Sequence, residues 1–405
     1  MPQLTVDGVV VSAPDGATIL DAARSINVDV PTLCWYPKLP TVGNCRICLV
    51  SVEGNPKLVA ACATQAAEGM VVTTESVAAV KNRQGVLGLL LERYPVEEIP
   101  AGGYRNEFEQ MVRRYRVPAE RRSGLPLRTG DERDDDPIIQ HDMSTCILCT
   151  RCVRACEDIQ VVGVLDVANR GDHAKIIVGA DGNPEHAGCT WCGECVRVCP
   201  TGAIHDILPM AVRAANGVST SRMRSKDMPE PDRTVRSVCP YCGVGCQIDL
   251  QVRDDTVVHV RSPWIEENTP NNGSTCVKGR FGTDFIQHRD RLLKPLIRRG
   301  WSKRDGRWEF DPAPHAAAGW GRRGGPWDLV QGEANEAKRR PKSNPLNTSP
   351  TGMGSLGDPR DRVATPASWY EPFREATWEE AMELAAQELV RLMETRGPKS
   401  LAVFQ

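Results

Sequence analysis

Residues 146–200 read Cys146-Ile-Leu-Cys149-Thr-Arg-Cys152-Val-Arg-Ala-Cys156, then a spacer of 32 residues, then Cys189-Thr-Trp-Cys192-Gly-Glu-Cys195-Val-Arg-Val-Cys199-Pro200. Each half has the spacing C-x2-C-x2-C-x3-C, and the second half ends in Cys-Pro. Cysteine thiolates are strong ligands for iron and zinc, so thiols grouped this densely predict metal centres. The other cysteines of the chain flank this pair of runs on both sides.

The spacing of the two runs favours iron–sulfur clusters over zinc. In ferredoxins with two clusters, the fourth cysteine of each run ligates the other cluster. This crossed pattern predicts two [4Fe-4S] clusters, one held by Cys146, Cys149, Cys152 and Cys199 and the other by Cys156, Cys189, Cys192 and Cys195. The alternative is a pair of zinc sites, but these favour two C-x2-C pairs over a run of four cysteines.

The composition predicts roughly two to four domains and no nucleic-acid or membrane partner. The 405 residues include 50 basic and 52 acidic side chains, which give a net charge of −2. Only 5% of residues are aromatic, whereas 16 are cysteine, so we expect metal sites to stabilise much of the fold. The sequence begins without a signal peptide and contains no stretch of 18 apolar residues, which predicts a cytoplasmic protein. In that compartment clustered thiols indicate metal rather than disulfides.

The first cysteine group has a different spacing and predicts a [2Fe-2S] centre. Residues 3–12 alternate around Asp7-Gly8 as a β-hairpin, and residues 17–26 have helical periodicity. Strand-like segments at 47–52 and 58–62 follow. The spacing C-x10-C-x2-C-x13-C on a glycine-containing loop suits a [2Fe-2S] cluster, with a structural zinc site as the alternative. The four ligands expected are Cys34, Cys45, Cys48 and Cys62.

A [2Fe-2S] domain followed by a two-cluster ferredoxin resembles the amino-terminal part shared by the large iron–sulfur subunit of complex I, iron-only hydrogenases and cytoplasmic formate dehydrogenase alpha subunits. Those families commonly carry a further cluster held by H-x3-C-x2-C-x5-C after a leucine-rich helix. Aligned on the leucine-rich segment 85–95, that motif falls on Tyr94, Glu98, Ala101 and Glu107, none of which supplies a thiolate. We therefore expect this cluster to be absent and the segment to be a helical spacer.

The fourth cysteine group comprises Cys239, Cys242, Cys246 and Cys276. Segments 246–250 and 257–260 alternate as strands around Asp254-Asp255. C-x2-C-x3-C followed by a distant Cys-Val-Lys-Gly-Arg is similar to the [4Fe-4S] domain of molybdopterin oxidoreductases. The resemblance implies a third [4Fe-4S] cluster, with zinc again the alternative. It also implies that Lys278 lies on the electron path between this cluster and the pterin cofactor, whereas position alone would favour a surface lysine.

The stretch from Arg280 to Ile297 resembles the formate dehydrogenase version of this domain. The resemblance implies an NAD-dependent enzyme with a flavin- and NAD-binding beta subunit. It also implies a molybdenum or tungsten bis(molybdopterin guanine dinucleotide) in a missing portion or a separate chain, and no catalytic residue within these 405 residues. Two alternatives remain open: the electron-transfer subunit of an NAD-reducing hydrogenase or complex I-like enzyme, and a non-redox interaction protein scaffolded by metal.

The carboxyl-terminal quarter predicts an irregular insertion followed by the start of another domain. Residues 311–367 contain eight Gly and eight Pro, so no regular core element is expected there. Thr377-Trp-Glu-Glu380 predicts a capping box at the start of a helix that ends at Gly397-Pro398, and Leu401–Phe404 reads as an apolar strand. A helix leading into a strand begins an α/β domain, so the sequence fits a fragment, a split subunit or a stand-alone carrier.

The predicted fold class is α+β, a chain of small iron–sulfur modules with the start of an unfinished α/β domain. The modules are a β-grasp-like [2Fe-2S] domain, a double-cubane ferredoxin and a molybdopterin-oxidoreductase [4Fe-4S] domain. The expected divisions are a [2Fe-2S] domain at 1–80, a helical spacer and linker at 81–136, the two-cluster ferredoxin at 137–212, a linker at 213–234, the [4Fe-4S] domain at 235–300, the insertion at 301–370 and the start of a pterin-binding domain at 371–405.

Overall fold

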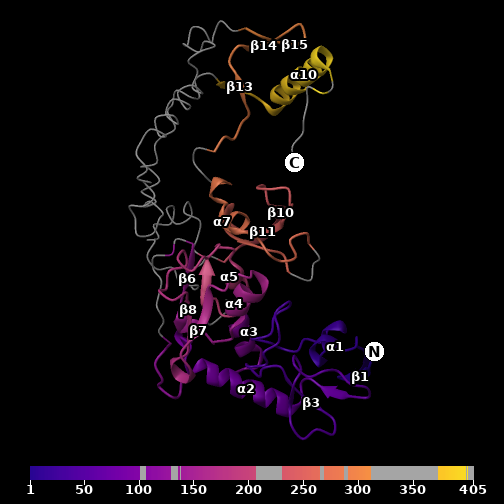
Figure 1. Ribbon diagram of the computed structural model, residues 1–405, viewed down its shortest axis with the longest axis vertical. Coiled ribbons are helices and arrows are strands. Elements are labelled where there is room, and N and C mark those ends of the chain that lie inside the picture. The colour runs from indigo at the N-terminus through magenta and orange to yellow at the C-terminus, as the bar shows by residue number, and fades with distance from the viewer. Residues whose placement is uncertain are drawn as a thin grey trace. The chain divides into compact units, whose positions relative to one another are not determined.

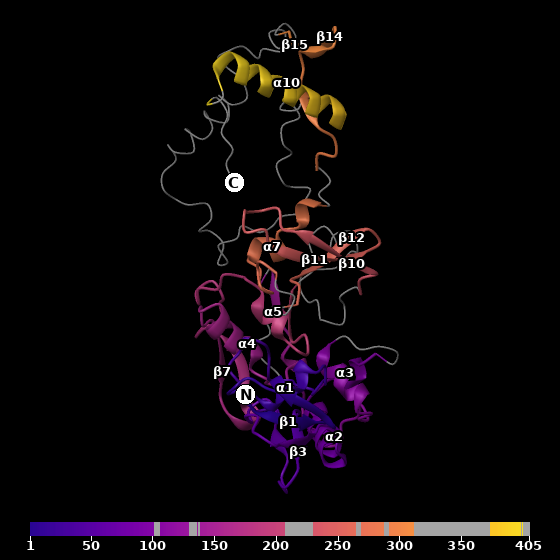
Figure 2. The ribbon, with the colours of Figure 1, turned by 90° about the vertical axis from the view of Figure 1, so that its right-hand side faces the viewer.

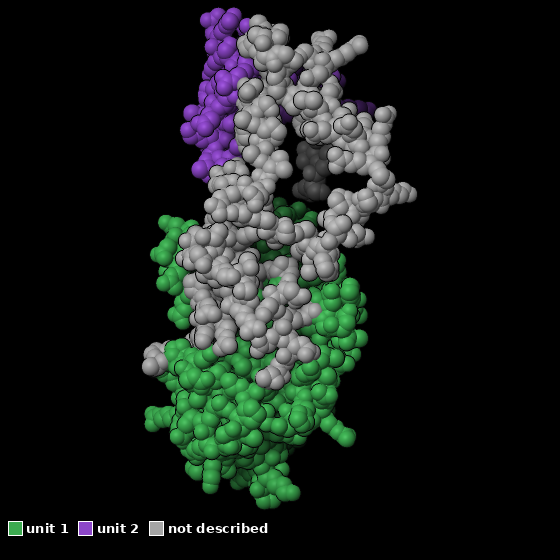
Figure 3. Space-filling view, turned by 90° about the vertical axis from the view of Figure 1, so that its left-hand side faces the viewer, with its two compact units in different colours: residues 1–289 green, residues 290–405 purple. Residues whose placement is uncertain are grey.

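The computed structural model describes residues 1–100, 106–128, 136, 138–206, 230–264, 269–286, 291–311, 373–397 and 399. The chain divides into two compact units, Met1–Arg289 and Asp290–Gln405, coloured green and purple in Figure 3. No helix within these described ranges is long and apolar enough to cross a membrane.

The first unit begins with a mixed sheet and one helix (Figure 1). The sheet has the order β2-β1-β5-β3-β4, in which β1 runs parallel to β5 and antiparallel to β2. The predicted hairpin is confirmed, because Asp7 (φ 49°) and Gly8 (φ 86°) form its tight turn. The elements are β1 (Gln3–Val6), β2 (Val9–Ser12), α1 (Ile19–Ser25), β3 (Leu49–Val52), β4 (Val59–Ala60) and β5 (Val71–Thr73).

Helix α1 packs on this sheet and closes the first core. Thr18 and Asp21 form a capping box at its amino terminus, which satisfies backbone N–H groups that would otherwise lack partners. Ile19 and Leu20 are fully buried against Leu4 and Val6 of β1. The sheet and helix therefore form a closed core to which the first cysteine loop is attached.

The predicted helical spacer consists of α2 (Val77–Leu91), the short 3₁₀ turn η1 (Val96–Glu98) and α3 (Glu107–Arg114). Buried side chains of α2 and α3, including Leu87 and Phe108, share a second core with Leu33 and Ile47 of the cysteine loop. The spacer therefore supports the loop that carries the first cysteine group.

The ferredoxin module follows, and its two halves meet through an antiparallel pair. Ile139 of β6 lies opposite Asp206 of β9, so the ends of the module are joined. Strand β8 pairs with β7, which precedes it. The elements are β6 (Ile139–His141), η2 (Met143–Thr145), α4 (Arg151–Arg154), η3 (Ala155–Ile159), β7 (Leu165–Ala168), η4 (Gly171–His173), β8 (Lys175–Val178), α5 (Glu194–Val198) and β9 (Ile204–Asp206).

A three-stranded antiparallel sheet completes the first unit (Figure 2). Its strands are β10 (Arg233–Val238), β11 (Gln247–Arg253) and β12 (Thr256–Arg261), followed by α7 (Val277–Phe281) and η7 (Asp284–Ile286). The strands predicted at 246–250 and 257–260 are confirmed. Strand β10 is an additional edge strand, and it begins within the residues predicted to be a linker.

The described residues of the second unit form two strand pairs and one long helix. The predicted helix is α10 (Trp378–Arg396), which begins with the capping box of Thr377 and Glu380. Residues 301–310, predicted to belong to the irregular insertion, instead form a hairpin of β14 (Trp301–Arg304) and β15 (Arg307–Phe310). Strand β13 (Leu296–Arg298), predicted to belong to the [4Fe-4S] domain, pairs here with β16 (Phe373–Glu375).

Several predicted segments lie outside the described residues. These are most of the linkers, the greater part of the insertion, and the final strand, at 129–135, 207–229, 312–372 and 401–405.

Candidate metal centres

The thiols of the first cysteine group form two pairs. The Sγ atoms of Cys48 and Cys62 lie 3.3 Å apart, and the thiols of Cys34 and Cys45 are hydrogen-bonded to each other. Cys34, Cys48 and Cys62 are each 1% exposed. A [2Fe-2S] cluster presents two irons to four cysteines, so two pairs of thiols suit it.

Hydrogen bonding within each pair favours one thiolate and one thiol. The bond with Cys45 lowers the pKa of Cys34 to about 5, with further lowering by backbone N–H groups and by the charge of Arg154. The bond with Cys62 lowers the pKa of Cys48 to about 7. The same bonds raise the pKa values of Cys45 and Cys62. Metal binding requires deprotonated ligands, and this loop already favours one thiolate in each pair.

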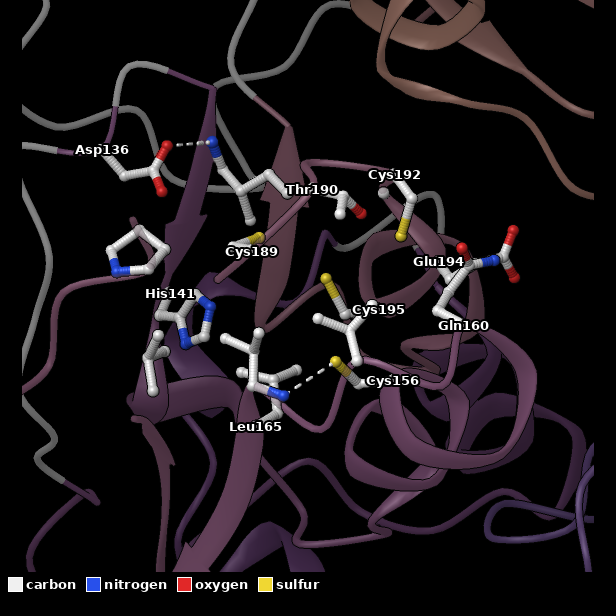
Figure 4. Close-up of a pocket in the computed structure, with 16 residues that line it drawn as sticks. Asp136, His141, Cys156, Gln160, Leu165, Cys189, Thr190, Cys192, Glu194 and Cys195 are labelled. Atoms are coloured by element: carbon white, nitrogen blue, oxygen red, sulfur yellow. Dashed lines mark hydrogen bonds between the residues drawn. The ribbon is translucent and has the colours of Figure 1, made fainter. Parts of the chain in front are cut away.

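One of the two predicted cubane sites is a cavity in the ferredoxin module (Figure 4). Cys156, from the first cysteine run, lines this cavity together with Cys189, Cys192 and Cys195 of the second run. The backbone N–H of Val164 donates to Cys156 Sγ at 3.3 Å. The structure thus brings together the four cysteines that the crossed pattern assigns to one cluster, and their role as ligands stays a prediction.

The other predicted set is Cys146, Cys149, Cys152 and Cys199. Burial raises the pKa of both Cys146 and Cys149 to about 12, with a contribution from the nearby charge of Cys199. Burial also raises the pKa of Cys152, again with a contribution from Cys199. Cys199 of the second run therefore lies with the first three cysteines of the first run. These thiols differ from the first group, because burial outweighs the nearby charges of Arg128 and Arg151, and a bound metal would supply the further positive charge that their thiolates need.

The two cysteine runs have the same local backbone geometry. The N–H of Leu148 donates to Cys146 Sγ, and the N–H of Trp191 donates to Cys189 Sγ, both at 3.4 Å. Leu148 and Trp191 share a positive φ (54° and 49°). Two residues later Thr150 (φ 60°) and Gly193 (φ 75°) share a positive φ again, each directly before a short helix. The repeated cysteine spacing in the sequence therefore corresponds to a repeated loop, in which a backbone N–H donates to the first cysteine sulfur of each run.

The fourth cysteine group lies between the β10–β12 sheet and α7. Burial raises the pKa of Cys246, and the charges of Cys239, Cys242 and Cys276 raise it further. The four thiols therefore lie near one another. Cys239 is 7% exposed, whereas Cys242 and Cys276 are exposed. This centre is thus the most open of the four groups.

Lys278 lies on α7, two residues beyond Cys276, and its side chain is exposed. Its Nζ lies 5.9 Å from the centroid of the Tyr241 ring, within the range of a cation–π contact. The contact places the ammonium group beside the cysteine loop 239–246, but the electron-path role implied by the resemblance stays a prediction.

The positions of the additional histidine-and-cysteine cluster motif are used structurally where they are described. Tyr94 is buried, and its hydroxyl donates to Glu109 Oε1 at 2.8 Å. Glu107 Oε2 accepts from Arg151 at 2.8 Å. Ala101 lies outside the described residues. The side chains at Tyr94 and Glu107 therefore join the spacer to itself and to the ferredoxin module.

No three His, Cys, Asp or Glu side chains in the described ranges converge closely enough to hold a single metal ion. In an iron–sulfur cluster with four cysteines, each iron takes only one or two of the thiolates. The four thiolates are therefore spaced more widely than four ligands of one ion.

Three family models match the first unit. Residues 2–77 match the 2Fe-2S iron-sulfur cluster binding domain, and residues 136–205 match the ferredoxin-like domain of NADH-quinone oxidoreductase subunit 3. Residues 232–288 match the molybdopterin oxidoreductase Fe4S4 domain. The matches support 2Fe-2S and 4Fe-4S clusters in a chain of small modules.

Curated relatives match half of the chain or more. An NADH-quinone oxidoreductase subunit of Rhizobium meliloti is 36% identical over 312 residues, or 76% of this chain and 34% of that protein. NADPH-Fe(3+) oxidoreductase subunit alpha of Geobacter sulfurreducens is 34% identical over 299 residues, or 74% of this chain and 33% of that protein. NADP-reducing hydrogenase subunit HndD of Solidesulfovibrio fructosivorans is 37% identical over 210 residues, or 50% of this chain and 36% of that protein.

The chain spans about a third of the length of these relatives, whose named activities differ. Residues 2–288 therefore contain the three kinds of iron–sulfur domain that these family models describe, and the chain is similar to about a third of the Rhizobium meliloti NADH-quinone oxidoreductase subunit.

Proposed function

We propose that the chain is the electron-transfer portion of an NAD-dependent formate dehydrogenase alpha subunit. In this proposal electrons leave formate at a molybdenum or tungsten pterin site outside the chain and reach a flavin- and NAD-binding partner subunit. The observation that carries the proposal is the gathering of all 16 cysteines, as free thiols in four groups, within one compact unit.

The chain's own residues supply ligands, burial and hydrogen bonds. One [2Fe-2S] and three [4Fe-4S] clusters, held by the four cysteine groups, would each take up and release single electrons. Backbone N–H groups of Leu148, Val164 and Trp191 donate to cysteine sulfurs, which stabilises thiolate charge. Each potential therefore depends on local burial and on these N–H donors, which differ among the four groups.

The choice of formate rests on the resemblance of residues 280–297 to formate dehydrogenases. The alternative is the electron-transfer subunit of a complex I-like enzyme or an NAD(P)-reducing hydrogenase, which the names of two relatives favour. A capture experiment with native partners separates them. A pterin-binding chain or domain supports formate dehydrogenase, and a hydrogenase subunit supports the alternative.

The redox role itself has a simple test. The reconstituted chain should absorb visible light, and dithionite should bleach that absorption, because iron–sulfur clusters are coloured and reducible whereas zinc thiolates are neither. A colourless protein that contains zinc would instead support the metal-scaffolded interaction protein. We also expect no formate oxidation by the chain alone with a dye acceptor, and turnover without an added subunit would contradict this.

A further inference from the structure

Two buried arginines join the ferredoxin module to the cysteine groups on either side of it, and each donates to the backbone of a neighbouring group. Arg154 lies between Cys152 and Cys156 at the end of α4 and is 8% exposed. Its Nη2 donates to the carbonyl of Cys34, a predicted ligand of the [2Fe-2S] centre, and its Nη1 donates to the carbonyl of Pro40 at 2.7 Å. One guanidinium therefore joins the cubane module to the [2Fe-2S] loop.

Arg280 occupies the corresponding position at the second junction. It lies on α7, four residues after Cys276, and is 2% exposed. Its Nε donates to the carbonyl of Cys192 at 3.3 Å, and its Nη2 donates to Ser262 Oγ at 3.3 Å. Cys192 is a predicted ligand of the cubane in the ferredoxin module, so Arg280 joins the fourth group to that cubane.

The side chain of Arg280 packs closely against Gly193, the residue after Cys192, because Gly193 has no Cβ atom. A Cβ atom on Gly193 would overlap with Cδ of Arg280, and it would lie 3.1 Å from the ring of Phe281. Gly193 also has a positive φ of 75°, a conformation that glycine adopts without strain. The loop that carries Cys192 is therefore built to receive the arginine closely.

The charge of each arginine matters because both are largely removed from water. A buried positive charge stabilises the extra negative charge of a reduced cluster, and the low local dielectric strengthens the effect. Nη1 of Arg280 is buried and has no hydrogen-bond partner among the described residues. Glu194 and Asp206 place negative charge near it, and Arg261 and Arg197 add positive charge.

We propose that Arg154 and Arg280 are positioning residues of the electron path, each of which fixes two neighbouring cysteine groups through a cysteine carbonyl and raises the reduction potential of the cluster it reaches. The inference rests on the proposed redox function. An electron that crosses either junction oxidises one cluster and reduces the next by one electron, and no proton or further reactant is required.

The experiment is a potentiometric titration of the reconstituted full chain, followed by electron paramagnetic resonance so that each cluster is read separately. Arg154→Gln should lower the [2Fe-2S] potential, with its reduction equilibrium weakened about tenfold, or about 59 mV for one electron. It should leave the cubane of Cys192 unchanged. Arg280→Gln should lower the potential of the cubane of Cys192 and leave the [2Fe-2S] potential unchanged. Each variant is therefore a control for the other.

Arg253→Gln is a surface control in the β10–β12 sheet. Arg253 is exposed at the end of β11, where it donates to the carbonyl of Glu230 and lies 3.8 Å from Asp254. The potentials of this variant should equal those of the unmodified chain. Fully loaded Arg154→Gln and Arg280→Gln variants with unchanged potentials would overturn the inference. So would equal shifts of both clusters in both variants.

Lysine variants keep the inference testable if a glutamine variant fails to fold. Arg154→Lys and Arg280→Lys keep the positive charge, so each should keep its cluster's reduction equilibrium within about threefold of the unmodified value, less than half the tenfold effect on a logarithmic scale. A lysine variant shifted tenfold would overturn the role of charge. A chain that binds no iron even before mutation would refute the proposed function instead, so the two failures are distinguishable.

Discussion

His259 and Asp206 form a buried pair that joins two modules of the first unit. His259 Nδ1 lies 3.2 Å from Asp206 Oδ2, and each side chain is 5% exposed. Asp206 ends β9 of the ferredoxin module, and His259 belongs to β12 of the following sheet. The guanidinium of Arg261 lies 3.8 Å from the same carboxylate. The contact therefore fixes the ferredoxin module against the sheet of the fourth cysteine group.

This pair predicts a loss of stability in acid. Burial alone would raise the pKa of Asp206, but the charges of Arg261, His259 and Arg280 outweigh it and hold the pKa well below its usual range. A lowered pKa in the folded state means that the stabilisation is complete above the ordinary value of about 3.9. It is lost as the pH falls through the lower, folded-state pKa.

The corresponding variant is Asp206→Asn. We expect it to cost about 3–5 kcal/mol at pH 7, because it removes the buried carboxylate that contacts His259 and offsets the charge of the buried Arg280. Its urea midpoint should approach that of the unmodified chain as the pH falls below about 4, because Asp206 then protonates first in the unfolded state and only at lower pH in the folded state. Asp255→Asn, at an ion pair whose carboxylate is 91% exposed, is the control and should not shift the midpoint measurably. Equal effects of the two variants at pH 7 would contradict the prediction.

Arg83 of α2 predicts a second stability effect, at the first cysteine loop. Its fully buried guanidinium donates to the carbonyls of Ile47 and Leu49 at 3.1 and 3.2 Å, and to that of Thr74 at 2.8 Å. Arg83→Met should destabilise the first unit by about 3 kcal/mol or more, because these buried carbonyls lose their donor. The [2Fe-2S] signal should then be lost at a lower urea concentration than the cubane signals.

Lys81→Met is the matched control on the same helix, because Lys81 is exposed. It should leave both the urea midpoint and the order of signal loss unchanged. If Arg83→Met lost the cubane signals first, Arg83 would not be the anchor of the [2Fe-2S] loop.

Iron content tests the four ligand sets. The reconstituted chain should bind about 14 iron atoms, two in the [2Fe-2S] cluster and four in each [4Fe-4S] cluster. Cys45→Ser should remove about two iron atoms, and Cys192→Ser about four, if each cysteine serves only its assigned cluster. Metal analysis together with acid-labile sulfide measures both. A count near four metal ions, with zinc present, would refute the iron–sulfur assignment.

Local patterns in the sequence predicted much of the fold. The hairpin at Asp7-Gly8 and the capping box at Thr377 depend on residues close in the chain, and both are confirmed. The sequence analysis did not predict the hairpin at Asp305-Gly306, although an Asp-Gly pair is an equally local turn signal. Both residues have the positive φ that such a turn requires, 48° and 80°, and they lie between paired strands. The many Gly and Pro residues that follow it led to the assignment of the whole segment as irregular.

Contacts between modules could not be predicted from the sequence. Arg154 and Arg280 stand beside cysteines in the sequence, but their acceptors, the carbonyls of Cys34 and Cys192, lie 120 and 88 residues away. Nothing in the spacing of the cysteines says which modules pack together. The cysteine groups follow from local spacing, whereas the arginines that join them follow only from the packing of one module on another.

Lys278 predicts a defect confined to one end of the electron path. Its exposed ammonium lies over Tyr241 beside the fourth cysteine group, away from buried cores, so Lys278→Gln should leave iron content and stability unchanged. In the complete enzyme, reduction of the clusters by the substrate of the pterin site should slow on the order of tenfold, the loss expected for one charge-assisted hydrogen bond. Reduction of the same clusters from the NADH side should keep its rate, because that entry bypasses Lys278. Stopped-flow absorbance with each reductant separates the two directions. Equal slowing from both sides would show that Lys278 affects the cluster itself, and unchanged rates from both would leave it as a surface lysine.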